Sequence, residues 1–555
     1  MLDMLIRGGS LIDGTGAPRK QTDVGVSGEK VSILSKGLVE KADKIIDAEG
    51  LIIAPGFIDS HSHSDLTAIF HHSGERSLKQ GITTEIVGNC GLSAAPLSER
   101  NRDYWRKYMA YLSQAGLSGF YAGWSSFTEF LERLSSLPLG SNLAFLVGHN
   151  TLRSMVMGIE GEGGERREPS DDQLNEMKSA LDNSMKAGAF GLSSGLTYPP
   201  GRNASKDELT ELCSVVATHD GVYASHLRGG NPAESLKEFL DVVRGSGVRG
   251  IASHLRGRVI SYPGGTSGDD PSIQAMLIQE ARLEGHEVFV DVIPIVSGLN
   301  SLVGVLFGGW GITDFSEIFD DEGKMVPIKT FVHKLSDIQK KKLVSEKARA
   351  HASSTGLYTR GDTRLIHYSP SHPEFMGKSV SEAAESFGLN VLDAIIKLTI
   401  DDCGDTRWGN TCLENDLKAL FSYDFTMPCT DGYWLPYSAE IPSMAAIPGP
   451  RIYGSFPYFL KTYQSDSLAI EKVVEKMTSL PAQAFRLKGR GVLKEGAYAD
   501  IVVLDPIQIS NNATYKNPMI PPSGIKYVIV NGTLAYSKGA LTTGAGKVLK
   551  NVHDV

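Results

Sequence analysis

The chain has little cysteine and no long apolar run. Its 555 residues contain five cysteines, none of them in a Cys-x-x-Cys pair. This scarcity indicates a reduced compartment, where any functional cysteine acts alone as a nucleophile or a ligand. No uninterrupted apolar stretch approaches the ~20 residues needed to span a bilayer, and the first residues pass straight into a strand-like pattern with no signal peptide. We therefore expect a cytoplasmic protein with no membrane partner.

An excess of positive charge is also missing. The formal net charge is −9 and no sustained basic stripe appears, which argues against nucleic acid as a main partner. Hydrophobic residues make up 41% of the chain and charged residues 21%, as is typical of globular proteins with a large core. We expect a small-molecule substrate as the partner, on the chemistry given below, and the composition does not report the oligomeric state.

Short strands with Gly-rich turns occupy both ends of the chain. We predict that residues 1–54 plus 488–555 form one small β-sandwich domain and that residues 55–487 form a second domain. The terminal strands are expected at 4–7, 24–26, 31–34, 51–54, 491–504 and 525–536.

The middle of the chain alternates apolar strands with helical segments, which is typical of β/α units and a parallel sheet. Eight strands and the lack of a Gly-x-Gly-x-x-Gly turn after any of them favour a closed, TIM-like (β/α)8 barrel over an open dinucleotide-binding sheet. Residues 296–350 interrupt the rhythm and are a candidate lid beside the site. The eight strands are expected at 56–60, 82–88, 142–148, 189–194, 222–225, 250–253, 288–295 and 425–430.

The first barrel strand ends in Pro55-Gly-Phe-Ile-Asp-Ser-His-Ser-His-Ser-Asp65. Side chains on a strand alternate between its two faces, so His61 and His63 share one face, with Asp59 and Asp65 on the same side. Two imidazoles flanked by carboxylates form half of a metal site. The alternative is a pair of partly exposed histidines beside a turn.

Further candidate ligands lie at the ends of other strands. Active sites of such barrels sit at the carboxyl ends of the strands, and the mixture of nitrogen, sulfur and oxygen donors favours zinc. Each residue alone has another interpretation, namely a small buried apolar thiol, a satisfied core histidine or an aspartate in a turn. Their coincidence at matching strand ends favours the metal. The six predicted ligands are His61, His63, Cys90, His226, His254 and Asp431.

Hydrolysis of an amide or a related C–N bond is the chemistry that this set predicts. A zinc ion lowers the pKa of bound water from ~15.7 to about 7 and polarises the carbonyl under attack. A nearby carboxylate can take the proton of that water and later deliver it to the leaving amine. We assign this acid/base role to Asp431.

Several longer motifs resemble those of one family. The chain resembles the amidohydrolase superfamily and, within it, the D-aminoacylase (N-acyl-D-amino-acid deacylase) family, over nearly its whole length. The motifs that carry the resemblance are Gly81-Ile-Thr-Thr84, Val87-Gly-Asn-Cys-Gly91, Gly191-Leu-Ser-Ser-Gly-Leu-Thr-Tyr-Pro-Pro200, Tyr223-Ala-Ser-His-Leu-Arg228, Pro450-Arg-Ile-Tyr-Gly-Ser-Phe456 and Met477-Thr-Ser-Leu-Pro-Ala482.

The resemblance implies a zinc held tightly by Cys90, His226 and His254. It also implies a second, weaker position near His61, His63 and Asp431, and a catalytic acid/base role for Asp431.

Two further positions match those associated with substrate binding in the family. They are Tyr198 and Arg451. A guanidinium suits a substrate carboxylate because it engages both oxygens. A structural salt bridge is the alternative for Arg451, and packing beside Pro199 and Pro200 is the alternative for Tyr198. His149 also lies at a strand end, either lining the site or in the core.

Two departures from the family bear on the substrate. The chain has Ile293-Pro-Ile295 where the family shows Tyr-Pro-Tyr, and the acidic residue after the His226 motif is missing. Our leading hypothesis is a zinc-dependent deacylase of N-acyl-D-amino acids or a related N-acyl compound. The alternatives are hydrolysis of another amide, either cyclic and hydantoin-like or bulky and apolar, and a non-catalytic scaffold with the same fold.

Overall fold

Eight parallel strands form the centre of the computed structural model, which describes residues 1–113, 117, 120–159, 168–260, 266–295, 320–324, 326, 330, 364–439, 449–464 and 468–551. Neighbours along the chain are hydrogen-bonded in order from the first strand to the last. A parallel bridge between Ser62 and Gly432 joins the first and last strands at their carboxyl ends, so the sheet nearly closes into a barrel. All eight predicted strands are present, and the predicted barrel is confirmed. The strands are β6 (Phe57–Asp59), β7 (Ile82–Val87), β8 (Asn142–Gly148), β9 (Gly191–Gly195), β10 (Val222–His226), β11 (Arg249–Ala252), β14 (Val288–Val292) and β17 (Thr426–Pro428).

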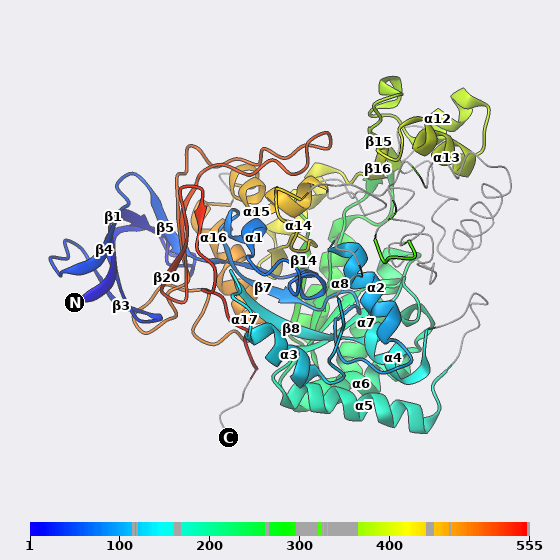
Figure 1. Ribbon diagram of the computed structural model, residues 1–555, viewed down its shortest axis with the longest axis horizontal. Coiled ribbons are helices and arrows are strands. Elements are labelled where there is room, and N and C mark those ends of the chain that lie inside the picture. Colours follow the sequence, from blue (N-terminus) through cyan, green and yellow to red (C-terminus); the bar gives the residue numbers. More distant parts are fainter. Residues whose placement is uncertain are drawn as a thin grey trace.

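Helices cover the outside of this barrel (Figure 1). Four consecutive ones, α5 to α8, begin at a Ser, Asn or Asp whose side chain accepts a hydrogen bond from a backbone N–H of the first turn, as helix N-termini prefer. Their apolar faces are buried and their other faces are exposed, which fixes which side packs on the sheet. The helices around the barrel are α1 (Glu75–Leu78), α2 (Arg102–Leu112), α3 (Phe127–Ser135), α4 (His149–Met157), α5 (Asp171–Lys186), α6 (Lys206–Thr218), α7 (Pro232–Ser246), α8 (Pro271–Leu283), α14 (Glu414–Ser422), α15 (Pro450–Thr462), α16 (Ile470–Met477) and α17 (Ser479–Ala484).

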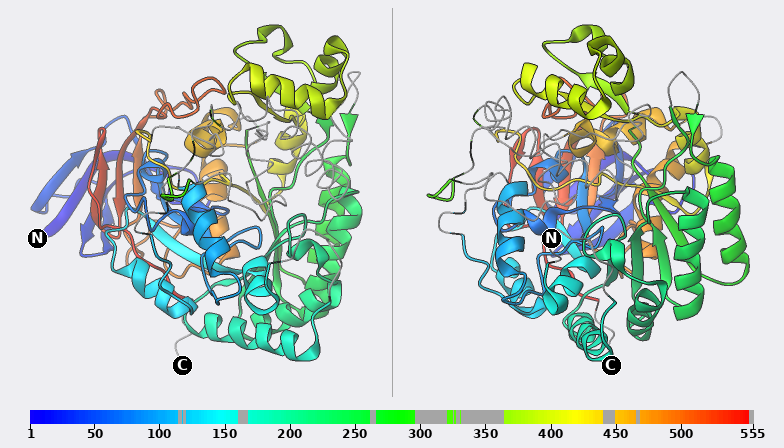
Figure 2. Two further views of the ribbon diagram at one scale, coloured as in Figure 1. Left: turned by 45° about the vertical axis from the view of Figure 1, so that its right-hand side comes forward. Right: turned by 90° about the vertical axis from the view of Figure 1, so that its right-hand side faces the viewer.

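Both ends of the chain contribute to a nine-stranded sheet beside the barrel (Figure 2). The two ends meet where β5 pairs antiparallel with β18, and side chains from both pack in one buried cluster that includes Ile6, Val26, Ile501 and Ile529. The domain boundaries given above stay a prediction. The strands are β1 (Leu2–Leu11), β2 (Lys20–Ser27), β3 (Lys30–Ser35), β4 (Ala42–Asp47), β5 (Ile52–Pro55), β18 (Ile501–Leu504), β19 (Ile525–Val530), β20 (Thr533–Ser537) and β21 (Ala540–Leu541).

A small unit projects from the barrel between β14 and β17. It consists of the antiparallel pair β15 (Arg364–Tyr368) and β16 (Arg407–Asn410) with the helices α12 (Val380–Phe387) and α13 (Val391–Asp401). The candidate lid, residues 296–350, lies almost entirely outside the described residues. Among the described helices, none is long and apolar enough to cross a membrane. The remaining short elements are β12 (Val259–Ile260), β13 (Thr266–Ser267) and the 3-10 turns Ser64–Leu66, Gly201–Asn203 and Pro373–Phe375.

Candidate metal centre

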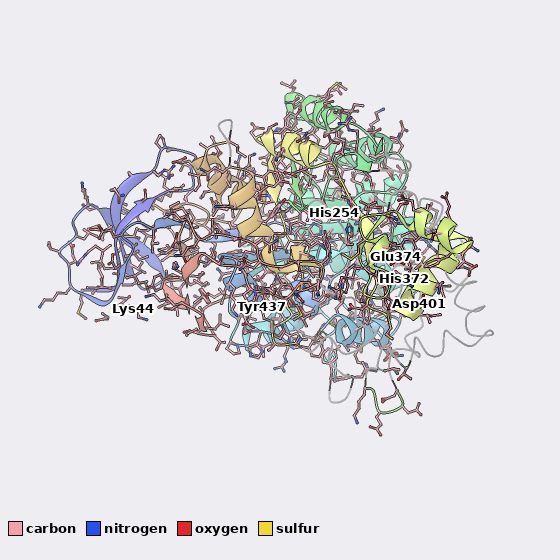
Figure 3. The ribbon with its side chains drawn as sticks, turned by 90° about the horizontal axis from the view of Figure 1, so that it is seen from above. Lys44, His254, His372, Glu374, Asp401 and Tyr437 are labelled. Atoms are coloured by element: carbon pink, nitrogen blue, oxygen red, sulfur yellow. The ribbon has the colours of Figure 1, made fainter. Side chains whose placement is uncertain are left out.

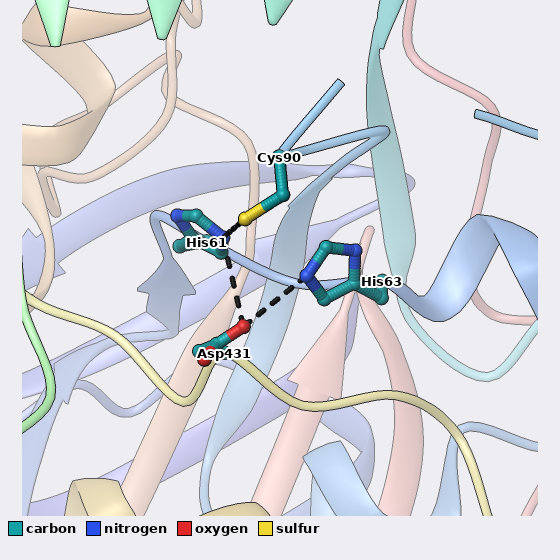
Figure 4. A group of neighbouring side chains, drawn as sticks. All are labelled: His61, His63, Cys90 and Asp431. Atoms are coloured by element: carbon teal, nitrogen blue, oxygen red, sulfur yellow. Dashed lines mark hydrogen bonds and ion pairs between the residues drawn. The ribbon is translucent and has the colours of Figure 1, made fainter. Parts of the chain in front are cut away.

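Three of the predicted ligands follow their strands in an unusual backbone conformation. Cys90, His254 and Asp431 have positive φ angles of 53°, 35° and 47°, a region that costs a non-glycine residue about 1–3 kcal/mol. Such strain persists only where the surrounding structure imposes it, and it concentrates at functional sites. The sharp turns let the side chains converge at the carboxyl end of the barrel, as Figure 4 shows for Cys90 and Asp431.

The thiol of Cys90 is the centre of the cluster. Its Sγ lies 3.3 Å from Nε2 of His61, 3.6 Å from Nδ1 of His226 and 3.4 Å from Nε2 of His254. Cys90, His61 and His254 are buried, and His226 is partly buried. One sulfur therefore faces an imidazole from each of three different strand ends.

The carboxylate of Asp431 contacts both histidines that follow the first barrel strand. Its Oδ1 lies 3.2 Å from Nε2 of His63 and 3.7 Å from Nε2 of His61. Its Oδ2 lies 2.5 Å from Nη1 of Arg451, which also donates to the backbone carbonyl of Thr430 at 3.0 Å and to that of Asp431. Arg451 thus fixes both the side chain and the backbone of Asp431.

The six predicted ligands fall into two overlapping groups, each with donor atoms within 4.8 Å of one another. The first contains His61, His63, Cys90 and Asp431, and the second contains Cys90, His226 and His254. Zn–S bonds of about 2.3 Å and Zn–N bonds of about 2.0–2.1 Å place tetrahedral S and N donors roughly 3.5 Å apart. The Cys90–histidine separations of 3.4 and 3.6 Å in the second group match this spacing.

Both anionic donors are held in their charged form. Burial raises the pKa of the Cys90 thiol, but the imidazoles of His61 and His254 outweigh it and hold this pKa well below its usual value. Burial likewise raises the pKa of Asp431, and the Arg451 guanidinium reverses the effect and holds it well below its usual value. A thiolate and a carboxylate are the forms that bind a divalent metal.

The histidines nearest these anions attract positive charge. Burial lowers the pKa of His63, but Asp431 and Cys90 raise it to about 9. Burial also lowers the pKa of His61, but Asp291 and Cys90 bring it well above its usual value. The field that keeps protons on these two rings equally favours a metal cation in their place, so the donor set fits zinc in charge as well as in spacing.

His226 lies in a different environment. Burial and the neighbouring His254 lower its pKa to about 4, so its ring is neutral and able to bind a metal. Its Nε2 lies 2.9 Å from the hydroxyl of Thr197, and its Nδ1 lies 3.1 Å from the hydroxyl of Tyr198. The hydroxyl of Tyr198, the predicted substrate residue, therefore lies beside the predicted ligand His226.

Other residues singled out from the sequence lie apart from the cluster. His149 is buried and pairs with Glu208 at 2.8 Å. It therefore lies in the core, which is one of the two places considered for it above. Asp59 accepts hydrogen bonds from the backbone and hydroxyl of Thr430, and Asp65 accepts from two backbone amides of the loop that carries Cys90. These two aspartates support the loops and belong to neither donor group among the described residues.

A second histidine–carboxylate cluster lies on the projecting unit. Figure 3 shows His372, Glu374 and Asp401 together there and apart from His254. His372 contacts Glu374 at 3.2 Å and Asp401 at 2.7 Å. The described residues of this cluster do not form a metal-ligand group.

Three residues near the site escaped the sequence analysis. Asp291 stands inside the apolar run Val288-Phe-Val-Asp-Val292, where a buried carboxylate is itself a signal. Thr197 lies in the loop after β9, where its residue type alone gives no signal of a functional role. Arg256, two residues after His254, is exposed and close enough to lower the pKa of His226.

The chain is similar to known proteins over nearly its whole length. The Amidohydrolase family matches residues 44–240 and 448–536. The chain is 30% identical to a D-aminoacylase of Alcaligenes xylosoxydans xylosoxydans over 99% of this chain and 97% of that protein. It is also 30% identical to an N-acyl-D-glutamate deacylase of the same organism, over 99% and 96% of the two chains.

A solved structure extends the likeness to three dimensions. It is an N-acyl-D-glutamate deacylase from Bordetella bronchiseptica, complexed with zinc and a phosphonate inhibitor that mimics the tetrahedral intermediate of the reaction. The TM-score is 0.73 at 28% sequence identity, over 99% of each chain.

Proposed function

We propose that this chain, which belongs to the amidohydrolase family, removes the acyl group from N-acyl-D-amino acids or a related N-acyl compound. It is a hydrolase of carbon–nitrogen bonds other than peptide bonds, and the substrate class and residue roles are our assignment. The observation that carries the proposal is the buried Cys90 thiol within 3.3–3.6 Å of three imidazoles. The relatives that match over nearly the whole chain are a D-aminoacylase and an N-acyl-D-glutamate deacylase, which supports the substrate class.

Zinc is the cofactor that we assign to this donor set. Cys90, His226 and His254 would hold one ion tightly, and His61, His63 and Asp431 would form a weaker second position. Bound there, zinc supplies water activated at neutral pH, because it lowers the pKa of water from ~15.7 to about 7, and it polarises the scissile carbonyl.

Asp431 is the proposed general acid/base. Its low pKa keeps it a carboxylate at neutral pH, so it can accept a proton from the attacking water and then pass this proton to the leaving amine. Its backbone and Oδ2 are held by Arg451, while Oδ1 faces His61 and His63. The carboxylate is thus aimed into the cluster before the substrate arrives.

The substrate would be oriented by a phenol and two guanidiniums. Burial raises the pKa of Tyr198, so its hydroxyl stays protonated and can donate to a carbonyl oxygen beside His226. The contacts that Arg451 makes among the described residues all use Nη1, which leaves its other nitrogens for a substrate carboxylate. The Arg256 side chain is exposed at the rim and is a second cation for the same role.

A bulky apolar or cyclic amide is the second candidate substrate. Ile293 and Ile295 follow β14 at the carboxyl end of the barrel and are both half-buried. Tyr463 donates to the carbonyl of Pro294 between them at 2.8 Å, which holds this apolar segment in place. An apolar wall lacks hydrogen-bond donors for a polar substrate and favours an apolar one.

The test is amine release by zinc-loaded protein from paired N-acetyl-D- and N-acetyl-L-amino acids, with a hydantoin in parallel. We expect turnover confined to the D series and a loss of about 10²–10⁴-fold in Asp431→Asn. The matched control is Asp241→Asn on the surface of α7, where Asp241 pairs with Lys206, and it should keep full activity.

Each contrary result has a separate meaning. Equal turnover of both series contradicts the D preference. Turnover of the hydantoin alone establishes the second candidate. Binding of zinc with no turnover of any substrate supports a scaffold that has lost the chemistry.

A further inference from the structure

Asp291 is a buried carboxylate to which the mechanism above gives no role. It lies near the carboxyl end of β14, at 0% exposure, and among the described residues it belongs to neither group of metal-ligand candidates. A carboxylate in such an apolar strand is costly unless it is paired and hydrogen-bonded. Its partners therefore indicate what it is for.

Two of these partners are predicted metal ligands from different strands. Both carboxylate oxygens lie 3.4 Å from Nδ1 of His61, and Oδ2 is the one in hydrogen-bonding geometry. Oδ1 also accepts a hydrogen bond from the backbone N–H of His254 at 2.7 Å, and the thiol of Cys429 donates to it at 3.3 Å.

The contact with His61 determines which ring nitrogen faces the cluster. A neutral imidazole carries one N–H and one lone pair. When the ring gives up one proton to bind a metal, an Nδ1–H directed at Asp291 leaves the lone pair on Nε2, which lies 3.3 Å from Sγ of Cys90 and 3.7 Å from Oδ1 of Asp431. A partner of this kind fixes the tautomer and ring orientation of a metal-binding histidine and raises its basicity.

The contact with His254 acts on the backbone. His254 has a φ of 35°, which is unfavourable for a residue with a side chain. The 2.7 Å hydrogen bond from its N–H to a carboxylate is charge-assisted and among the stronger ones in proteins. This hydrogen bond offsets the cost of the strained backbone. In that backbone conformation, Nε2 of His254 lies 3.4 Å from Sγ of Cys90.

We infer that Asp291 is a positioning residue that prepares His61 and His254 to bind zinc, one through its tautomer and the other through its backbone. This inference rests on the proposed zinc centre and adds to it a residue that touches neither metal nor substrate. The Thr197 hydroxyl lies 2.9 Å from Nε2 of His226, beside the ring nitrogen that faces away from Cys90.

The matched test compares zinc affinities by competition with a chelator. Asp291→Asn keeps the size and an oxygen for the His254 N–H, but its amide NH₂ group can face the Nδ1–H of His61 only as another donor. We expect its zinc affinity to fall about 10- to 100-fold, as for other partners of metal-binding histidines, with the unfolding midpoint of the metal-free protein little changed. Asp291→Ala, which loses both contacts, should bind more weakly still.

The control is Glu208→Gln. Glu208 is also a buried carboxylate paired with a histidine, His149, at 2.8 Å, but this pair lies outside the cluster, so zinc affinity should equal that of the wild type. An Asp291→Asn affinity within twofold of wild type overturns the inference. Failure of the wild type itself to bind zinc overturns the metal centre, which keeps the two failures distinct.

A second measurement uses only the wild type, so it tests the inference even if Asp291→Asn fails to fold. In a crystal structure of the zinc-loaded wild type, His61 should bind through Nε2 while its Nδ1 remains in contact with Asp291. A ring that binds through Nδ1, or Asp291 itself on the metal, contradicts the inference.

Discussion

Cys90 is the side chain that both donor groups share, so it offers the sharpest test at the scale of one residue. Cys90→Ser keeps the size but replaces a thiolate with a hydroxyl that stays protonated. We expect the bound zinc to fall to background and amine release to drop at least 100-fold, with metal-free stability changed by less than ~1 kcal/mol. Metal analysis of the purified protein measures the first effect.

The control is Cys403→Ser, since Cys403 is exposed and also has a positive φ, 51°. Its zinc content and activity should match those of the wild type. Retention of stoichiometric zinc by Cys90→Ser would contradict the assignment of Cys90 as a ligand.

Lys476 allows a pH prediction well away from the metal centre. It is 5% exposed, and burial lowers its pKa from 10.5 to about 8, while its ammonium donates to the carbonyls of Tyr423 and Thr426. Between pH 8 and 10.5 the unfolded chain binds more protons at this site than the folded protein does. The contribution of Lys476 to stability therefore rises with pH through this window, by up to about 3 kcal/mol.

The comparison variant is Lys476→Met, which cannot titrate. The difference in unfolding midpoint between wild type and variant should shift in favour of the wild type from pH 8 to pH 10. A difference that stays constant with pH would contradict the lowered pKa.

At the scale of elements, one buried ion pair connects the loops that carry His63 and Asp431. Glu85 of β7 accepts hydrogen bonds from Ser62 at 2.6 Å and Ser64 at 2.7 Å, on the first loop. Arg76 of α1 donates to Glu85 at 2.7 Å and to the Thr430 hydroxyl at 3.0 Å, on the second loop. Both members of the pair have fully buried side chains.

Removing one charge leaves the other buried without its main partner, so we expect Arg76→Met to destabilise the protein by about 3–5 kcal/mol. In the double variant with Glu85→Gln the loss should be clearly smaller than the sum of the two single losses. Urea unfolding of the four proteins measures this coupling. Additive losses would show that the two side chains act independently.

The elements also show what the sequence could predict and why the rest escaped it. Apolar runs bounded by turns identified all eight barrel strands, and the parallel arrangement then brought the six predicted ligands together at one end. β4 was missed because Asp43, Lys44 and Ile45 are exposed and give it no alternating pattern. Asp291 was missed because its importance depends on contacts with His61 and His254, which are distant in sequence and become neighbours only in the barrel.

At the scale of the whole molecule, residues 547–551 lie against the barrel on the side opposite the candidate metal centre. The carbonyl of Lys547 accepts from the N–H of Leu143, and the N–H of Leu549 donates to the carbonyl of Leu143, at 2.9 and 2.8 Å. The N–H of Asn551 donates to the carbonyl of Gly188 at 2.9 Å. The segment thus forms an isolated parallel bridge with the amino end of β8, between Val548 and Leu143.

A chain that stops after Ala545 loses these backbone hydrogen bonds, each with a net value of about 0.5–1.5 kcal/mol. We expect its unfolding midpoint to fall by several degrees, while its zinc affinity stays that of the wild type, because the donor groups lie at the carboxyl ends of the strands. Scanning calorimetry and the chelator competition measure the two quantities on the same sample. A loss of zinc affinity in this truncated chain would show that the two ends of the barrel are coupled, and that Leu143 influences the loops at the far end of its own strand.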